Sequence, residues 1–322
     1  MRLLILGYSS IAQRRVIRAA AQTAAISEVS IASKSRAEPN EGWPKRGHFF
    51  ADYDLALRES QADIVYVSLP NAMHEHWVLA ALASGKHVLV DKPAMTTREA
   101  CERGVKQARL SGRMLAEATV FDYHPHFEAL RGFLAVQGPL THVDAQFIIP
   151  PLPAANFRNH TEFGGGCLLD MSPYAAGLMR ILGGGLPSHV TALAGTRHPE
   201  TGVDMGFSVQ ARLANGGIFS GHFSFEGEYQ NRLLIVARSG SVMIERVFSP
   251  PADHRMEWRQ HVRNVETVVT FEAADTFARF LDAATRAIAA DDHEPLHRDL
   301  LADAECRARI AAALADPPTL VR

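Results

Sequence analysis

The chain of 322 residues is poor in cysteine, in lysine and in long apolar runs. Its three cysteines, Cys101, Cys167 and Cys306, are scattered and odd in number, so they predict neither a disulfide framework nor a Cys-x-x-Cys metal pair. No apolar run reaches the roughly 18–20 residues that cross a bilayer. With 33 basic against 35 acidic residues and no long run of one sign, we expect a protein that binds neither nucleic acid nor membrane.

The first apolar run, Arg2–Leu6, is short because Tyr8, Ser9 and Ser10 interrupt it. A signal peptide needs about 7–15 apolar residues at this point. We therefore expect a buried first strand and a cytoplasmic protein. Apolar residues make up 47% of the chain and charged residues 21%, and the length exceeds that of one typical domain. This composition predicts a globular protein of two domains.

The two halves of the sequence differ in pattern. Over residues 1–120, short apolar runs alternate with helical spacing, which predicts an α/β domain, a Rossmann doubly wound parallel sheet that binds a dinucleotide. Over residues 121–322, alternating strands are separated by turn signals such as Asn215-Gly216 and Ser239-Gly240. This half predicts an α+β domain with a mostly antiparallel sheet, for substrate binding and oligomerisation.

A degraded dinucleotide fingerprint follows the first strand. The pattern Gly-x-Gly-x-x-Gly/Ala uses its first glycine for the turn and its second for the approach of backbone to the pyrophosphate. Here Gly7 and Ala12 fit, whereas Ser9 occupies the middle position, with Ser10 and Ile11 between. A serine is small, and its hydroxyl can donate to a phosphate. A plain strand–turn–helix is the alternative.

The end of the second strand indicates which dinucleotide binds. A free ribose 2′-hydroxyl is usually met by an acid at this point. This chain instead has Ser33, Lys34 and Arg36, and the first acid is Glu38. A hydroxyl and two cations suit a 2′-phosphate. We therefore expect NADP(H) as the preferred cofactor, with NAD(H) as the alternative.

Several motifs resemble one enzyme family. Pro70-Asn71, Lys92-Pro93, Gly164-Gly165-Gly166 and the pair Asp170 and Tyr174 occur in the order and spacing of the glucose–fructose oxidoreductase/inositol dehydrogenase (Gfo/Idh/MocA) family. The resemblance covers nearly the whole chain. Within the family, the chain is similar to NDP-sugar ketoreductases.

The resemblance implies a role for each matching position. Ser68, Leu69 and Asn71 would line the nicotinamide side, with His74 beside the cofactor. Asp91 replaces the usual glutamate before Lys92, which is the family's active-site lysine. Further positions implied at the substrate are His124 and Arg158. Glu117 either touches the nicotinamide site or pairs with an arginine.

Ketone reduction needs a hydride from the nicotinamide and a proton for the developing alkoxide. Tyr174 can donate the proton if a nearby cation lowers its pKa from about 10. Lys92 can supply that field or act as the acid itself. Asp170 stands four residues before Tyr174, so both share one helix face and Asp170 can orient a sugar hydroxyl or the lysine.

These expectations combine into an NADP(H)-dependent oxidoreductase that transfers a hydride between nicotinamide and a ring ketone or alcohol of a sugar or nucleotide-sugar. The alternatives are a reductase or dehydrogenase of a cyclic polyol or dihydrodiol, and a non-catalytic dinucleotide-binding regulator, which Ser9 and Ser172 would favour. No metal is expected, because His74-x-His76 and His124-x-His126 lack further ligands at recognised spacing. The family suggests a homodimer or homotetramer through the C-terminal sheet.

Overall fold

The computed structural model describes residues 1–316, which divide into two compact units. The first unit holds residues 1–123 and 275–301, and the second holds residues 124–274 and 302–316. The first unit thus takes in residues 275–301, which lie beyond the range 1–120 expected for the dinucleotide-binding part. The reason is packing: Phe277, Phe280 and Leu281 are buried in one core with Leu3 and Ile5 of the first strand.

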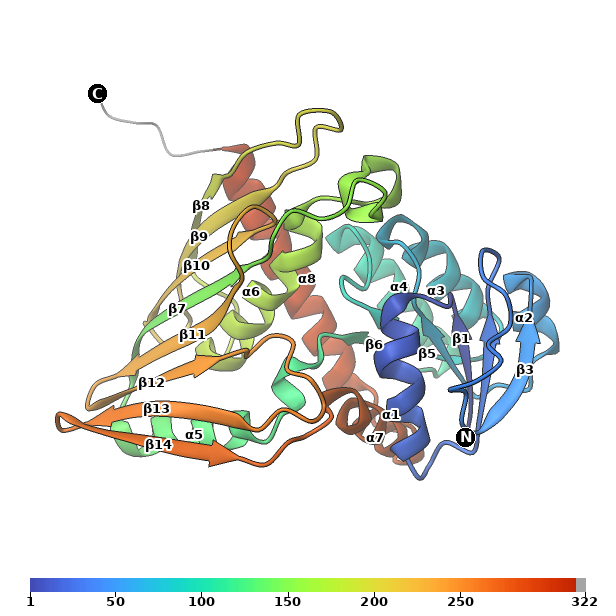
Figure 1. Ribbon diagram of the computed structural model, residues 1–322, viewed down its shortest axis with the longest axis horizontal. Coiled ribbons are helices and arrows are strands. Elements are labelled where there is room, and N and C mark those ends of the chain that lie inside the picture. The colour runs from blue at the N-terminus through green and yellow to red at the C-terminus, as the bar shows by residue number, and fades with distance from the viewer. Residues whose placement is uncertain (317–322) are drawn as a thin grey trace. The chain divides into compact units, whose positions relative to one another are not determined.

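The first unit contains a six-stranded parallel sheet with the order β3-β2-β1-β4-β5-β6 (Figure 1). Its strands are β1 (Arg2–Leu6), β2 (Glu28–Ala32), β3 (Arg46–Phe50), β4 (Ile64–Val67), β5 (His87–Asp91) and β6 (Leu115–Ala118). Its helices are η1 (Ala12–Val16), α1 (Ile17–Gln22), α2 (Tyr53–Glu59), η2 (Asn71–Met73), α3 (His74–Ala83), α4 (Arg98–Ser111), η3 (Val120–Tyr123), α7 (Thr276–Ala289) and the start of α8 (Glu294–Ala315). Apart from the exposed Arg2 that begins β1, the central strands β1 and β4 are apolar and buried, as expected of a sheet covered on both faces.

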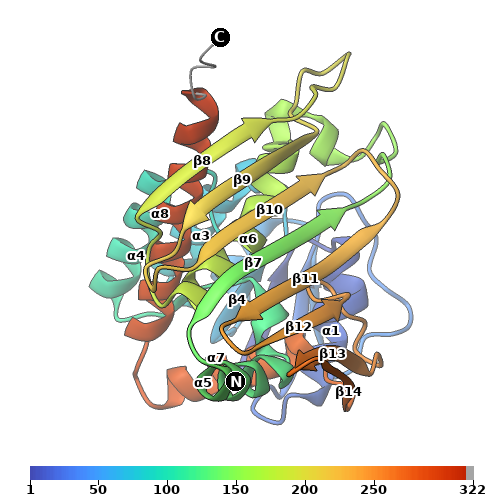
Figure 2. The same cartoon turned by 90° about the vertical axis from the view of Figure 1, so that its left-hand side faces the viewer.

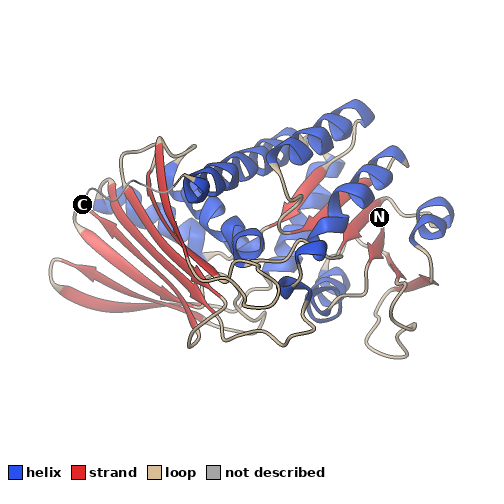
Figure 3. Cartoon of the chain, turned by 90° about the horizontal axis from the view of Figure 1, so that it is seen from above, coloured by secondary structure: helices blue, strands red, loops and turns tan. Residues whose placement is uncertain are grey.

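The second unit contains an eight-stranded sheet with the order β14-β13-β12-β11-β7-β10-β9-β8. Its strands, which Figure 3 shows in red side by side, are β7 (Leu140–Ile148), β8 (His189–Ala194), β9 (Gly206–Arg212), β10 (Ile218–Ser224), β11 (Gln230–Ala237), β12 (Gly240–Glu245), β13 (Met256–Val262) and β14 (Val265–Phe271). Only the β7–β10 pair among these strands is parallel. The expected fold class, a Rossmann sheet plus an α+β part with a mostly antiparallel sheet, is confirmed.

The helix α6 (Cys167–Gly183) packs on one face of this second sheet (Figure 2). Buried and half-buried residues alternate along β7 and β11, so one side of each strand faces the core. The unit also holds α5 (His126–Gln137), η4 (Phe157–Asn159), η5 (Thr161–Phe163) and the end of α8. Over residues 1–316, no helix is both long and apolar enough to span a bilayer.

Candidate active site

The turn after β1 is built around Gly7. Its φ of +97° lies in the left-handed region, and a Cβ there would come within 2.2 Å of the Ser68 carbonyl oxygen. Only glycine fits this close approach of the β1 and β4 strand ends. Helical backbone begins at Ser10, so the turn leads directly into a helix. A strand, a glycine turn and a helix N-terminus form the geometry that receives a pyrophosphate in doubly wound folds.

Ser9 is tied into a chain of hydrogen bonds along the carboxyl ends of the strands. Ser68 Oγ donates to Asp91 Oδ2 at 2.6 Å, and Tyr66 OH donates to Asp91 Oδ1 at 2.6 Å. Ser9 Oγ lies 2.7 Å from Ser68 Oγ and accepts from the Ala12 amide at 3.0 Å. Because Ser68 has one hydrogen and gives it to the carboxylate, Ser9 must be the donor to Ser68.

The Ser9 hydroxyl therefore donates to Ser68, and the expectation that it donates to a phosphate is not met. Its only hydroxyl hydrogen is used within the chain, whereas the sequence suggested a bond to a phosphate. Burial and the Asp91 carboxylate raise the pKa of Tyr66 well above its usual value, so Tyr66 remains a donor in the chain. These hydrogen bonds therefore join the turn after β1 to the end of β5, next to Lys92.

Exposed cations follow β2. Lys34 and Arg36 are exposed, and buried Ser33 accepts a hydrogen bond from the Arg36 amide at 3.1 Å. The Lys34 ammonium lies 3.2 Å from Asp52 Oδ2 and 5.1 Å from the Tyr53 ring centre. The Leu55 amide and the Lys34 ammonium together lower the pKa of Asp52. Positive charge thus gathers at the strand end that meets a cofactor ribose in this fold class.

The loops after β4, β5 and β6 are braced against one another. His74 is fully buried, with Nδ1 2.8 Å from the Pro93 carbonyl oxygen and Nε2 2.8 Å from the Leu69 carbonyl oxygen. Glu117 Oε2 accepts from the Ala94 amide at 2.6 Å. These contacts fix the backbone on the C-terminal side of Lys92, whose peptide bond to Pro93 is cis and whose side chain is half-buried.

The second group of site residues lies at the start of α6. Arg158 Nε is 2.9 Å from Asp170 Oδ1, and the Asp170 side chain is only 8% exposed. Tyr174, one turn further on, is half-buried with its ring centre 5.2 Å from those of Phe147 and Phe248. The helix thus presents a carboxylate paired with a guanidinium, followed by a phenol against an aromatic wall.

A residue that the sequence analysis missed holds this helix end. Asp204, in the segment between β8 and β9, accepts from the Leu168 amide through Oδ2 at 2.5 Å, and its carbonyl oxygen accepts from the Cys167 amide at 2.8 Å. Burial raises the pKa of the Asp204 carboxyl, and the Leu168 amide opposes this shift. Asp204 is 36 residues from Leu168 in the sequence, so no local spacing points to it.

Asn231 organises the aromatic wall beside Tyr174. It is buried, its Oδ1 accepts from the Phe248 amide at 3.1 Å, and its Nδ2 donates to Tyr229 OH at 3.1 Å. The loop that carries Phe248 is therefore fixed to β11. Asn231 thereby holds the segment whose Phe248 ring packs against the phenol ring of Tyr174.

His124 is also buried, and its Nδ1 accepts from the His126 amide at 3.3 Å. Desolvation lowers the pKa of His126 to about 3. Across residues 1–316, no three His, Cys, Asp or Glu side chains come together as a metal site would require.

The predicted residues fall into two groups, one in each unit. The first unit holds Gly7, Ser9, Ser10, Ile11, Ala12, Ser33, Lys34, Arg36, Ser68, Leu69, Asn71, His74, Asp91, Lys92 and Glu117, and the second unit holds His124, Arg158, Asp170 and Tyr174. Within the first group, the contacts above link the ends of β1, β4, β5 and β6. Within the second, Asp170 and Arg158 are in direct contact and Tyr174 shares the helix.

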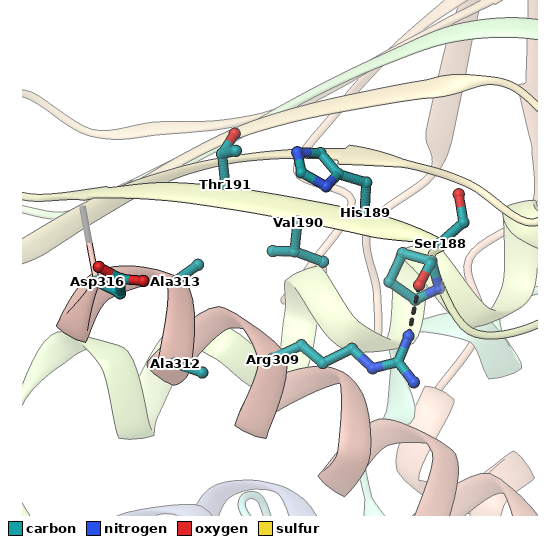
Figure 4. A pocket seen from close by; sticks show the side chains of 9 residues that line it. Ser188, His189, Val190, Thr191, Arg309, Ala312, Ala313 and Asp316 are labelled. Atoms are coloured by element: carbon teal, nitrogen blue, oxygen red, sulfur yellow. Dashed lines mark hydrogen bonds between the residues drawn. The ribbon is translucent and has the colours of Figure 1, made fainter. Parts of the chain in front are cut away.

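A cavity of about 530 Å³ lies elsewhere in the second unit (Figure 4). It is lined by the start of β8 and the last turns of α8, including Val190, Thr191 and Arg309. The Arg309 guanidinium donates to the Pro187 carbonyl oxygen at 2.6 Å. None of the predicted site residues lines this cavity, so it is separate from the candidate site.

Comparison with known proteins defines the class. The profile described as "Oxidoreductase family, NAD-binding Rossmann fold" matches residues 1–119, and the GFO/IDH/MocA C-terminal domain matches residues 136–243. The chain therefore belongs to the Gfo/Idh/MocA family of oxidoreductases, and the family prediction is confirmed.

Its similar relatives include sugar ketoreductases. A dTDP-3,4-didehydro-2,6-dideoxy-alpha-D-glucose 3-reductase from Saccharopolyspora spinosa is 32% identical, over 90% of this chain and 88% of its own length. An enzyme of the same name from Actinomadura kijaniata is 30% identical, over 90% and 88%. A crystal structure of a 3-ketoreductase from Actinomadura kijaniata, in complex with NADP and TDP-benzene, superimposes with a TM-score of 0.91 at 28% identity and covers 98% of both chains.

Proposed function

We propose that the chain is an NADPH-dependent ketoreductase that reduces a ring ketone of a nucleotide-linked sugar. The observation that carries this proposal is the similarity to 3-ketoreductases over nine-tenths of the chain, which spans both the dinucleotide-binding and the C-terminal parts. The nucleotide on the substrate is inferred from the dTDP-sugar substrates that these relatives' names give.

The residues after β1 and β2 fit NADPH. Gly7 allows the tight turn after β1, because a Cβ there would meet the Ser68 carbonyl oxygen, and the helix start that follows this turn would receive the pyrophosphate. Exposed Lys34 and Arg36 supply charge for a 2′-phosphate, and Lys34 would exchange its contact with Asp52 for the phosphate. When bound, the cofactor supplies the hydride.

Lys92, Asp170 and Tyr174 then serve the proton half of the reaction. As the carbonyl carbon gains the hydride, the Tyr174 hydroxyl gives its proton to the carbonyl oxygen, which becomes the alcohol. The Lys92 ammonium stabilises the phenolate that remains. Asp170, held by Arg158, accepts a hydrogen bond from a neighbouring sugar hydroxyl and so orients the ring.

The other predicted residues support binding. Ser68, Leu69, Asn71 and Asp91 would line the nicotinamide side, while His74 and Glu117 fix the loops that carry it. His124 and Arg158 would border the sugar. We further propose that the protein acts in the cytoplasm as a homodimer or homotetramer through the open face of the C-terminal sheet, where Leu193 is 61% exposed.

The test is NADPH oxidation by the full chain, followed by its absorbance, with a TDP-linked keto-sugar, the same keto-sugar without nucleotide, and NADH in place of NADPH. We expect turnover to be fastest with NADPH and the nucleotide-linked ketone. Tight NADPH binding without turnover of any keto-sugar would instead favour the regulator.

The cofactor preference has its own variant. Replacing Lys34 by Ala should raise the KM for NADPH about 10- to 100-fold, the effect of one charge-assisted contact, and leave the KM for NADH unchanged. Better use of NADH than of NADPH by the wild-type chain would overturn the role of Lys34 and Arg36.

A further inference from the structure

The start of α6 has no capping side chain of its own. A helix leaves its first N–H groups without partners inside the helix, and an Asp, Asn, Ser or Thr at the N-cap usually accepts from one of them. The N-cap residue of α6 is Gly166, which has no side chain. The first amides of the helix must therefore be satisfied from elsewhere in the fold.

Asp204 supplies acceptors for the first two of these amides. Its carbonyl oxygen takes the Cys167 amide and its carboxylate takes the Leu168 amide, the first two residues of the helix. A carboxylate at this end also interacts favourably with the helix dipole. Asp204 thus does the work of an N-cap residue while belonging to a distant segment.

Gly166 and Asp204 depend on each other. A Cβ on Gly166 would lie 2.4 Å from Asp204 Oδ1, and the φ of +108° at Gly166 disfavours any other residue. The carboxylate therefore occupies the space that a side chain at the N-cap would need. The other two glycines of this run are constrained as well, Gly164 by its φ of +71° and Gly165 by a Cβ position 2.5 Å from the Arg158 carbonyl oxygen.

The helix start sets the place of the site residues. The Asp170 amide donates to the Gly166 carbonyl oxygen at 3.2 Å, so Asp170 stands in the first turn, and Tyr174 follows one turn later. The Gly166 amide donates to the Arg158 carbonyl oxygen at 2.8 Å, which brings in the partner of Asp170. Any shift of residues 166–168 would move the carboxylate and the phenol together.

We propose that Asp204 is a positioning residue of the ketoreductase reaction, which fixes the start of α6 and through it the places of Asp170 and Tyr174. This inference rests on the proposed function and deepens it. Asp204 touches neither the cofactor nor the carbonyl in this account. Its effect should therefore appear in kcat and in the KM for the sugar, and not in NADPH binding.

The experiment compares Asp204→Ala, Asp204→Asn and the wild-type full chain for kcat, for the KM of the sugar, for the Kd of NADPH and for the melting temperature. Asp204→Ala should lower kcat about 10- to 100-fold, the scale expected for an ångström-sized misplacement of reacting groups. The Kd of NADPH should not change. Asp204→Asn should recover part of kcat, because its amide oxygen can still accept from Leu168.

A matched control separates positioning from loss of a cap as such. Asp275 caps α7 by accepting from the Phe277 and Ala278 amides at 3.0 and 3.3 Å. Asp275→Ala should lower the melting temperature and leave kcat as in the wild type. A kcat loss in Asp275→Ala equal to that in Asp204→Ala would overturn the positioning role.

A second route covers the case in which Asp204→Ala does not fold. In Gly166→Ala, the added Cβ would displace the Asp204 carboxylate, so this variant should also lower kcat. Folded Asp204 or Gly166 variants with wild-type kcat would overturn the inference while leaving the ketoreductase function intact. A wild-type chain that reduces no keto-sugar would overturn both.

Discussion

The two groups of site residues are built in different ways. In the first unit, polar groups stand at the ends of neighbouring strands, and a chain of short contacts from Ser9 to Asp91 joins them along one sheet edge. In the second unit, the groups stand on one helix whose start is held by Asp204 and Arg158, which come from outside it. The positions of the first group of residues therefore follow from sheet topology, whereas those of the second group depend on a few long-range contacts.

The largest effect on stability is expected when the ion pair of the second group, Arg158 with Asp170, is broken. Arg158→Ala removes the guanidinium partner of nearly buried Asp170 and should cost about 3 kcal/mol in the free energy of unfolding, within the range for a broken buried pair. Urea unfolding measures this loss.

The matched control is the exposed pair of Arg255 and Glu272, whose side chains are 63% and 84% exposed. Arg255→Ala should change the free energy of unfolding by less than about 1 kcal/mol, because solvent screens an exposed pair. Equal losses in both variants would show that burial does not distinguish the α6 pair.

A second comparison sets one buried histidine of each unit against the other. Desolvation, aided by nearby Arg113, lowers the pKa of His87 in the first unit to about 4, and desolvation lowers that of His126 in the second to about 3. Both pKa values lie below the ordinary histidine value of 6.5. The unfolded chain therefore binds protons first, and stability should fall as pH drops from 6.5 toward 4.

The two histidines should respond differently to replacement by Phe. His87 Nδ1 accepts from the Met114 amide at 3.1 Å, so His87→Phe should cost about 1–3 kcal/mol at neutral pH. Neither ring nitrogen of His126 has a hydrogen-bond partner within the described residues, so His126→Phe should be nearly neutral at pH 7 and more stable than wild type in acid. Thermal melts across this pH range measure both. Each variant should lose part of the wild-type acid sensitivity, and a pair of variants as acid-sensitive as the wild type would contradict the assignment.

The smallest effect is expected on the Kd of NADPH, when the hydrogen bonds that Ser9 makes at the strand ends are removed. Ser9→Gly restores the usual glycine of the fingerprint but removes the bonds to Ser68 and Ala12. We expect the Kd of NADPH to rise about 3- to 10-fold, the value of one neutral hydrogen bond. Ser84→Gly, at the exposed end of α3, is the control and should leave the Kd unchanged. Tighter NADPH binding by Ser9→Gly would show that the serine only obstructs the pyrophosphate.

Much of the architecture could be predicted because burial leaves a pattern in the sequence. The continuous apolar runs of β1, β4 and β5 indicated a buried parallel sheet, and the motif residues Lys92, Asp170 and Tyr174 indicated the family. Strands without such a pattern were missed. Strand β3 (RGHFF) is only partly buried, and β14 is exposed at most positions, so neither carries a regular apolar run.

Tertiary contacts account for the remaining differences. The placement of α7 with the first unit follows from packing of Phe277 and Phe280, which no local spacing reveals. Asp204 was missed because its partners lie 36 and 37 residues away in the chain. The direction of the Ser9 hydroxyl follows from what Ser68 gives to Asp91, a relation between three strand ends.

The central proposal is that Lys92 of the first unit and Tyr174 of the second act on the same carbonyl. A double-mutant cycle of kcat with Lys92→Ala, Tyr174→Phe and the double variant tests it most directly. Each single change should lower kcat about 100- to 10,000-fold, and the double variant should be no worse than the poorer single one, since both remove one proton-transfer step. Losses that multiply in the double variant, or a Tyr174→Phe enzyme with wild-type kcat, would contradict the account.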